Sequence, residues 1–90
     1  MKAHGDYLTS AAQTALVALG ENIRTARLRR RMTMQLLAER AGISLPTLRR
    51  LEKGDGGVSL TVMANVLTGL DLEDTIDRMA DPLQDLLGIA

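Results

Sequence analysis

The chain has 90 residues, enough for one domain with its own hydrophobic core, and 46% of them are apolar. It contains no cysteine, which excludes disulfides and thiolate metal sites, and no apolar run approaches the roughly 20 residues that a membrane helix needs. The formal net charge is zero, but residues 1–53 carry ten basic and four acidic side chains, whereas residues 54–90 carry one and seven. A polyanion could dock on the basic half, because a Debye length of about 8 Å screens it from the acidic half.

The first predicted helix follows an N-terminal tail, residues 1–9, which we expect to be flexible. Ser10-Ala11-Ala12-Gln13 has the spacing of a capping box. Apolar residues behind it recur at the helical period through to about Arg31, namely Leu16, Leu19, Ile23 and Ala26. Gly20 inside this helix costs about 1 kcal/mol relative to alanine, which indicates either the close approach of another backbone or a mild helix defect.

Two short helices joined by a tight turn are predicted between residues 33 and 54. Thr33 can cap the first of them, and Gly42 permits a sharp turn after an apolar face made by Leu37, Ala38 and Ala41. Ser44 can cap the second, with Pro46 in its first turn, where a missing N–H costs nothing. Leu48 and Leu51 of this helix point inward, and the side chains left outside are Thr47, Arg49, Arg50 and Lys53. This arrangement is a helix-turn-helix.

Two further helices are predicted after the flexible turn at residues 54–57. Ser59 can cap the first, which Gly69 ends and whose inner side consists of Leu60, Met63, Ala64 and Leu67. Asp71 and Asp74 resemble a capping arrangement for the second, which Asp81-Pro82 terminates and whose inward residues are Leu72, Ile76 and Met79. The remaining apolar residues have no obvious place within the domain and are Leu83, Leu86, Leu87 and Ile89. No strand pattern is present.

The composition argues against an enzyme and against a single-stranded nucleic-acid partner. The only histidine, His4, lies in the predicted tail, so we expect no catalytic activity and no cofactor or metal. The acidic residues from Asp71 to Asp81 lack the glycine and terminal glutamate of a calcium loop, and the solvated helix face is the preferred interpretation. Binding by base stacking needs aromatic side chains, and the only one is Tyr7.

Double-stranded DNA needs no aromatic side chains, because arginines on one inserted helix can grip base edges in the major groove. The arginines between residues 24 and 31 cannot all face one duplex, since a helix spreads successive positions by about 100°. Arg27 and Arg31 share a face at i and i+4, so we expect them to contact the DNA backbone, with plain surface charge as the alternative. Thr33 is primarily a cap and secondarily a phosphate donor.

From about Leu19 to Leu72 the sequence resembles the lambda-repressor-like family of helix-turn-helix regulators, the XRE or Cro/C1 type. The matching residues are Leu19-Gly20-Glu21-Asn22-Ile23-Arg24, Thr33, the segment 37–44, Leu48, the segment 51–54 and Ser59-Leu60. The resemblance implies an all-α, five-helix domain over residues 10–81, whose third helix reads bases through Ser44, Leu45, Pro46, Thr47, Arg49 and Arg50. Leu45 and Pro46 offer only apolar contact, so a guanine is expected opposite one of the arginines.

The resemblance also implies phosphate contacts around the start of the second helix and the end of the third, from Thr33, Met34, Gln35 and Lys53. The family's usual glutamine after the capping threonine is here Met34, with Gln35 displaced by one position. The side chain that commonly supports this backbone contact is therefore lost or replaced.

Residues 67–88, LTGLDLEDTIDRMADPLQDLLG, are similar to the ends of HipB-like antitoxins encoded beside HipA-type kinases. This second resemblance implies a type II toxin-antitoxin antitoxin that binds operator DNA as a dimer, represses its own operon and binds the kinase toxin. The tail, residues 82–90, is then an interaction segment, and its leucines and Ile89 contact either the toxin or a second copy of the chain.

Two alternatives to the antitoxin remain, a stand-alone autoregulated repressor and a protein adaptor. For a DNA-binding dimer we expect recognition helices about 34 Å apart on a pseudo-palindromic operator, in a cytoplasmic, nucleoid-associated protein.

Overall fold

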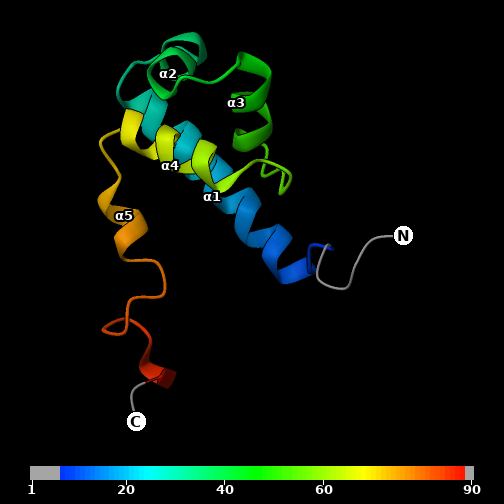
Figure 1. Cartoon of the computed structure of the whole chain (residues 1–90), viewed down its shortest axis with the longest axis vertical. Helices are drawn as coiled ribbons and strands as arrows, with labels where there is room; N and C mark the ends of the chain where they lie inside the picture. Colours follow the sequence, from blue (N-terminus) through cyan, green and yellow to red (C-terminus); the bar gives the residue numbers. More distant parts are fainter. Residues whose placement is uncertain (1–6, 89–90) are drawn as a thin grey trace.

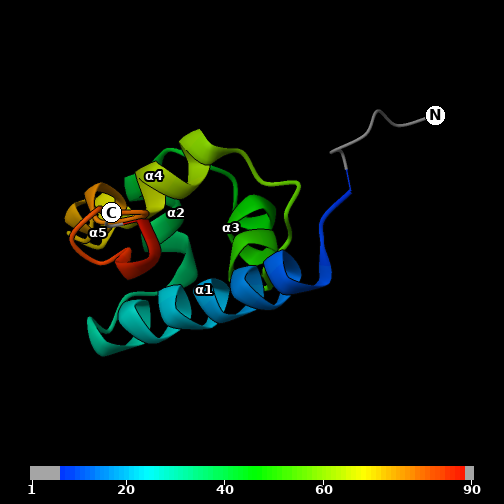
Figure 2. The same cartoon turned by 90° about the horizontal axis from the view of Figure 1, so that it is seen from below.

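The computed structural model describes residues 7–88, and within this range the chain is all-helical with no strand, which confirms the predicted fold class. The helices are α1 (Ser10–Arg29), α2 (Met34–Ala41), α3 (Leu45–Glu52), α4 (Leu60–Gly69) and α5 (Asp74–Asp77), followed by a 3-10 turn, η1 (Leu86–Gly88). The long α1 lies along one side of the molecule with α2, α3 and α4 gathered against it (Figures 1 and 2). α3 packs on α1, and α2 packs on both α3 and α4.

One hydrophobic core lies between these four helices. Its fully buried side chains come from every one of them and from the end of α4, namely Ile23, Leu37, Leu48, Val66 and Leu70. Burial of a leucine, isoleucine or valine side chain stabilises a fold by about 1.5–3 kcal/mol. The two helices of the helix-turn-helix therefore pack their inner faces against one shared hydrophobic core, and their outer faces are exposed to solvent.

The helix N-termini are capped locally, by hydroxyl side chains. Thr33, Ser44 and Ser59 each accept the backbone N–H of the residue three positions on, at 3.1–3.3 Å, as predicted. The cap of α1 is Thr9 and not Ser10, because the Thr9 hydroxyl accepts the N–H of Ala12 at 3.1 Å. The predicted capping box is therefore wrong.

Gln13, the last residue of that predicted capping box, is used differently. Its side-chain Nε2 donates to the carbonyl of Gly54 at 3.4 Å, which joins the start of α1 to the loop after α3. A long-range partner of this kind cannot be read from the spacing of residues within one helix.

Gly20 marks the place where α3 ends against α1. A Cβ atom at this position would lie 2.5 Å from the carbonyl oxygen of Glu52 and 2.8 Å from that of Leu51, so only glycine fits. Of the two interpretations of Gly20, the close approach of another backbone is the correct one. Gly54 makes a second such contact, because a Cβ there would lie 2.7 Å from the backbone of Val17.

The inner face of α4 is only partly the predicted one, since Ala64 is half-buried and the fully buried Val66 was not predicted. Leu60 is 73% exposed, whereas Met63 and Leu67 are buried as expected, together with Val66 and the capping residue Leu70. Leu60 is the first residue of α4, and its side chain is left in solvent.

The fifth helix is a single turn of four residues, and its predicted cap is wrong. Asp71 adopts a left-handed conformation (φ 59°) that closes the end of α4, and no side chain caps α5. Leu72 and Ile76 pack against the core as predicted, but Met79 is 60% exposed.

The chain after α4 extends away from the body of the molecule, on the side far from α3 (Figures 1 and 2). Leu83 and Leu87 are 84% and 100% exposed, so nothing within residues 7–88 covers them. The side chain of Leu86 and the whole of Ile89 lie outside the described residues, as do residues 1–6 of the predicted N-terminal tail. None of the described helices combines the length and the apolar character needed to cross a lipid bilayer.

Candidate nucleic-acid interface

The turn between α2 and α3 sets the angle between the two helices. Gly42 takes a left-handed conformation (φ 69°), and the N–H groups of Gly42 and Ile43 donate back to carbonyls in the last turn of α2. This double closure is a Schellman motif, which ends a helix sharply. Ser44 then caps α3 through its hydroxyl, so only three residues lie between the end of α2 and the start of α3.

The first turn of α3 presents hydroxyl groups and apolar surface to solvent. The hydroxyls of Ser44 and Thr47 lie 2.8 Å apart and are hydrogen-bonded to each other, and Ser44 also accepts the Thr47 N–H. Pro46 is exposed and Leu45 is half-buried. These four residues therefore form one continuous edge of the predicted base-reading surface, and whether they contact bases stays a prediction.

The two arginines of α3 have different environments although both are exposed. The side chain of Arg49 forms no hydrogen bond or ion pair with any of residues 7–88. The Nε of Arg50 donates to Oδ2 of Asp55 at 2.7 Å, and both side chains remain about half exposed. This hydrogen bond is the main cause that lowers the pKa of Asp55 below its ordinary value, with help from the N–H of Gly57. The same bond raises the pKa of Arg50.

An open groove of about 460 Å³ runs between α1, the start of α2 and α3. Four of its lining residues are cations and one is an acid, and the set is Arg24, Arg27, Met34, Arg49, Glu52 and Lys53. Glu52 is already paired with Arg27, so the charge left in the groove comes from Arg24, Arg49 and Lys53. These three are exposed and have no ionic partner among the described residues. The groove is thus suited to an anion.

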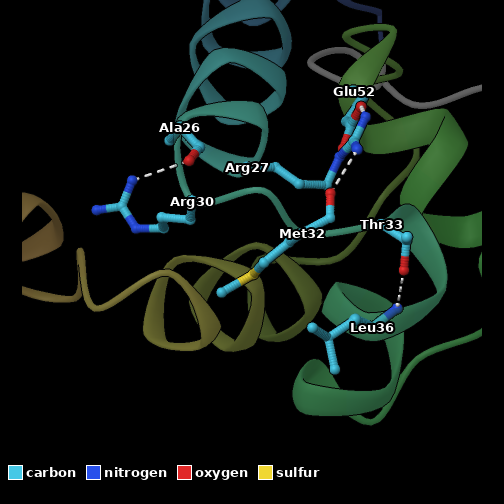
Figure 3. A network of polar contacts seen from close by, with 7 residues as sticks. All are labelled: Ala26, Arg27, Arg30, Met32, Thr33, Leu36 and Glu52. Carbon is cyan, nitrogen blue, oxygen red and sulfur yellow. Dashed lines mark hydrogen bonds and ion pairs between the residues drawn. The ribbon is translucent and has the colours of Figure 1, made fainter.

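Arg27 is not the surface cation that its spacing predicts. It is only 6% exposed, and its guanidinium grips Glu52 twice, through Nε at 2.8 Å and Nη2 at 3.1 Å. Its Nη1 also donates to the carbonyl of Met32 at 3.0 Å (Figure 3). Arg27 therefore joins α1, α3 and the loop before α2, and its assignment as an exposed phosphate contact is corrected to a structural one.

Arg31 does not share a helical face with Arg27, because α1 ends at Arg29. Arg31 follows in a left-handed conformation (φ 55°), exposed and without an ionic partner among the described residues. The predicted shared face with Arg27 is therefore wrong, and the phosphate contact of the exposed Arg31 stays a prediction.

The start of α2 presents backbone N–H groups of the kind that hold phosphates. The Thr33 hydroxyl is occupied as the cap, accepting the N–H of Leu36 at 3.1 Å (Figure 3). Met34 is half-buried and lines the groove, and Gln35 is exposed. These three residues, with Lys53 at the far end of α3, remain predicted phosphate contacts.

Two residues of this surface were not predicted. Arg24 precedes Arg27 by three positions on α1, so both lie on the side of α1 that faces α3, and this spacing was the available signal. Asp55 was counted only as an acid of the C-terminal half, although it is paired with Arg50 of α3. The position of Asp55 depends on the turn that ends α3, and the charge pattern of the sequence does not predict that turn.

Comparison with known proteins supports a helix-turn-helix assignment. A protein-family model described as a helix-turn-helix domain matches residues 18–80, which includes α1 from its middle onward, α2, α3, α4 and α5. No curated protein and no solved structure matches the chain. The matched family is a DNA-binding one and is typically non-enzymatic. The chain belongs to the helix-turn-helix domain family, of the XRE/lambda-repressor type, and is a DNA-binding regulator.

Proposed function

We propose that the chain is a sequence-specific repressor that binds double-stranded operator DNA as a homodimer, with α3 in the major groove. The observation that carries this proposal is the groove beside α3, where Arg24, Arg49 and Lys53 are exposed and no acid among residues 7–88 pairs with them. Unpaired cations at the edge of an exposed helix are what a phosphate backbone requires, since each phosphate contact releases a condensed counterion.

The residues divide by the part of the duplex that each would contact. Arg50 lies on the exposed side of α3 away from the groove, and with Ser44, Pro46 and Thr47 it supplies base contacts. Arg49 lies in the groove with Arg24 and Lys53, so it contacts phosphate at least as readily as a base edge. The helix α5, which carries Asp74 and Asp77, lies far from α3 (Figure 1), so its acids do not offset the cations of the groove.

The experiment is a titration of duplex DNA at two or more salt concentrations. The logarithm of the binding constant should fall by about 0.9 per log unit of salt for each phosphate neutralised. Arg24→Ala should weaken binding to every sequence and reduce this slope by about 1 for each copy of the residue in the complex. Arg78→Ala is the matched control, because Arg78 is an exposed cation at the C-terminal end of α5 and lies 3.6 Å from Asp74. A chain that binds no duplex at any of these salt concentrations, or whose weak binding does not depend on salt, would instead support the protein adaptor.

A toxin-antitoxin role is a second candidate, favoured by the exposed apolar residues after α5. Met79, Leu83 and Leu87 are all more than half exposed. The segment after α5, to which they belong, lies on the side of the molecule far from α3 (Figure 1). A protein partner could therefore be bound while α3 remains on DNA in the cytoplasmic nucleoid. We propose that such a partner is a HipA-like kinase toxin encoded beside this chain.

The test of the toxin-antitoxin role is co-expression with the product of the neighbouring gene. A stable complex with a kinase-like protein, lost in a Leu83→Ser, Leu87→Ser double variant, would support an antitoxin. A neighbouring gene that encodes no kinase, or a kinase that does not bind, would leave a stand-alone autoregulated repressor.

A further inference from the structure

The loop after α3 folds back onto the recognition helix. Gly54 takes a left-handed conformation (φ 81°), its N–H donates to Leu51 at 3.0 Å, and the N–H of Asp55 donates to the carbonyl of Arg50 at 3.0 Å. These are the two hydrogen bonds of a Schellman motif. Because Gly54 is also packed against Val17 of α1, the loop is anchored to the body of the domain and not only to α3.

This turn brings the carboxylate of Asp55 to the side chain of Arg50, five positions earlier. Oδ2 accepts Nε–H of Arg50 at 2.7 Å, and Oδ1 accepts the backbone N–H of Gly57 at 2.7 Å. Asp55 is thus held by the loop through one oxygen and holds Arg50 through the other. Gly57 also lies close to the far end of Arg50, since a Cβ there would be 2.8 Å from Nη2.

The contact uses only one edge of the guanidinium. Of the five N–H groups of an arginine, the one on Nε is occupied by Asp55, whereas neither Nη1 nor Nη2 of Arg50 forms a hydrogen bond with residues 7–88. Two terminal amino groups in one plane are the donors that pair with O6 and N7 of guanine. A side chain held in advance in one orientation also loses less conformational freedom when it binds.

We propose that Asp55 is a specificity-determining residue, which positions Arg50 so that its two terminal amino groups read a guanine in the major groove. The inference rests on the proposed function, because it assumes that α3 enters a duplex. Asp55 itself acts through Arg50 and touches no base.

The opposite interpretation makes the opposite prediction. If Asp55 merely neutralised Arg50, it would compete with DNA, and its removal would tighten binding to all sequences because one negative charge leaves the basic face. If Asp55 positions Arg50, its removal lowers the preference for guanine even though the protein becomes more basic. Neutralisation thus predicts higher affinity for every sequence, whereas positioning predicts a lower preference for the guanine that Arg50 reads.

The experiment uses duplexes selected by the wild-type protein from a random pool, with single guanines replaced by 7-deazaguanine, which lacks N7. We expect wild-type affinity to fall by about 5- to 150-fold at one guanine of each half-site. Arg50→Ala and Asp55→Asn should both make that replacement nearly harmless. Glu39→Gln is the matched control, because Glu39 is an exposed acid of α2 that forms no hydrogen bond or ion pair with Arg50. This variant should retain the wild-type dependence.

A second variant changes no charge. Gly57→Ala would place a methyl group 2.8 Å from Nη2 of Arg50 and 3.1 Å from Oδ1 of Asp55, and should also abolish the guanine dependence. Gly56→Ala is its control, because the added methyl would meet only the flexible side chains of Leu8 and Leu16. Melting temperatures of all variants show whether they remain folded.

Three results would overturn the inference. They are a wild type insensitive to every 7-deazaguanine, an Asp55→Asn variant that keeps the full wild-type dependence, and an Asp55→Asn variant whose preference for the read guanine increases. A wild type that binds no duplex at any salt concentration would remove the proposed function as well. Salt-dependent binding with unchanged guanine dependence in Asp55→Asn would remove only the inference.

Discussion

Three arginines on or beside α3 have three different environments, namely Arg27, Arg49 and Arg50. Arg27 is buried and shares two hydrogen bonds with Glu52. Arg49 is exposed in the groove with no partner among the described residues, and Arg50 is exposed but held by Asp55. Sequence spacing alone treats the three as equivalent cations, since burial and pairing depend on where α1 and the loop after α3 lie relative to α3.

Loss of one member of the Arg27–Glu52 pair should destabilise the whole domain. Glu52→Ala would leave the guanidinium of Arg27 buried with only the Met32 carbonyl as an acceptor. Removal of one partner from a buried ion pair typically costs about 3–5 kcal/mol. We expect a decrease of this size in the free energy of unfolding, measured by urea denaturation.

The matched experiment for this pair replaces both residues by apolar ones of similar size. Arg27→Met together with Glu52→Met should be less destabilising than Glu52→Ala alone, because no charge is then buried without a partner. A loss below about 1 kcal/mol for Glu52→Ala would show that water reaches Arg27 and that the pair is not effectively buried.

The Arg50–Asp55 pair predicts a pH dependence at the acid end. The pKa of Asp55 is lowered in the folded protein, mainly by the hydrogen bond from Arg50. Its contribution to stability is therefore complete above the ordinary pKa of an aspartate and is lost as the pH falls through the lowered value. Because both side chains are exposed, the effect on stability is small, and the titration of the carboxyl group itself is the better measurement.

Titration of the Asp55 carboxyl by NMR should show an upward shift of its pKa in Arg50→Ala. Arg49→Ala is the control, since Arg49 lies on the other side of α3, in the groove, and should leave that pKa unchanged. Equal values in the wild type and in Arg50→Ala would mean that the ion pair does not persist in solution.

At the scale of the elements, the predictions that succeeded are those that depend on neighbours in the sequence. The hydroxyl caps of α2, α3 and α4 and the left-handed glycine after α2 require only a few consecutive residues, and all four were predicted correctly. The predictions that failed depend on contacts between helices. Leu60 fits the periodicity of α4 but is exposed at the first position of that helix, and Met79 follows an α5 that is too short to bury it.

The same distinction applies to the candidate interface. The exposed side of α3 could be predicted, because two buried leucines, Leu48 and Leu51, define the opposite side of a short helix. The groove could not, because it is bounded by residues from three helices. Gly20 is an intermediate case. Its place inside a helix indicates a close backbone contact, but the sequence does not say that the partner is the end of α3.

The residue that follows the end of α1, Arg31, has a strained backbone conformation, and this strain can be tested. Arg31 adopts φ 55°, a conformation that costs a residue with a side chain about 1–2 kcal/mol and costs glycine little. Arg31→Gly should therefore raise the free energy of unfolding by about 0.5 kcal/mol, after allowance for the greater freedom of glycine in the unfolded chain. The same variant should weaken binding to all DNA sequences alike if Arg31 contacts phosphate.

Arg29→Gly is the control for this strain, because Arg29 is the last residue of α1 and has an ordinary helical conformation. It should destabilise the domain by about 1 kcal/mol. If Arg31→Gly is as destabilising as Arg29→Gly in thermal unfolding, then the left-handed conformation of Arg31 is not a source of strain.

At the scale of the whole molecule, the two ends of the fold have different character. The groove beside α3 is lined by cations, whereas the segment from α5 onward is rich in aspartates and carries exposed apolar side chains. In the cartoon this segment extends away on the side far from α3 (Figures 1 and 2). Because the formal charges of the chain cancel, this separation is invisible in the net charge. An arrangement of this kind allows one end to hold DNA and the other to hold a protein, whether a second copy or a different chain.

The tail after α5 should therefore decide the oligomeric state. Truncation after Asp81 removes Leu83 and Leu87, which no residue in the described range 7–88 covers, and leaves the core from Ile23 to Leu70 intact. We expect the truncated protein to fold with an unchanged helical CD spectrum but to sediment as a monomer at concentrations where the full chain is a dimer. On DNA it should bind single half-sites, with a weaker preference for two half-sites about 34 Å apart, because that spacing is set by the dimer. A truncated protein with unchanged mass and unchanged operator affinity would instead place the dimer contact elsewhere, and the exposed leucines would then be available to a partner of a different kind.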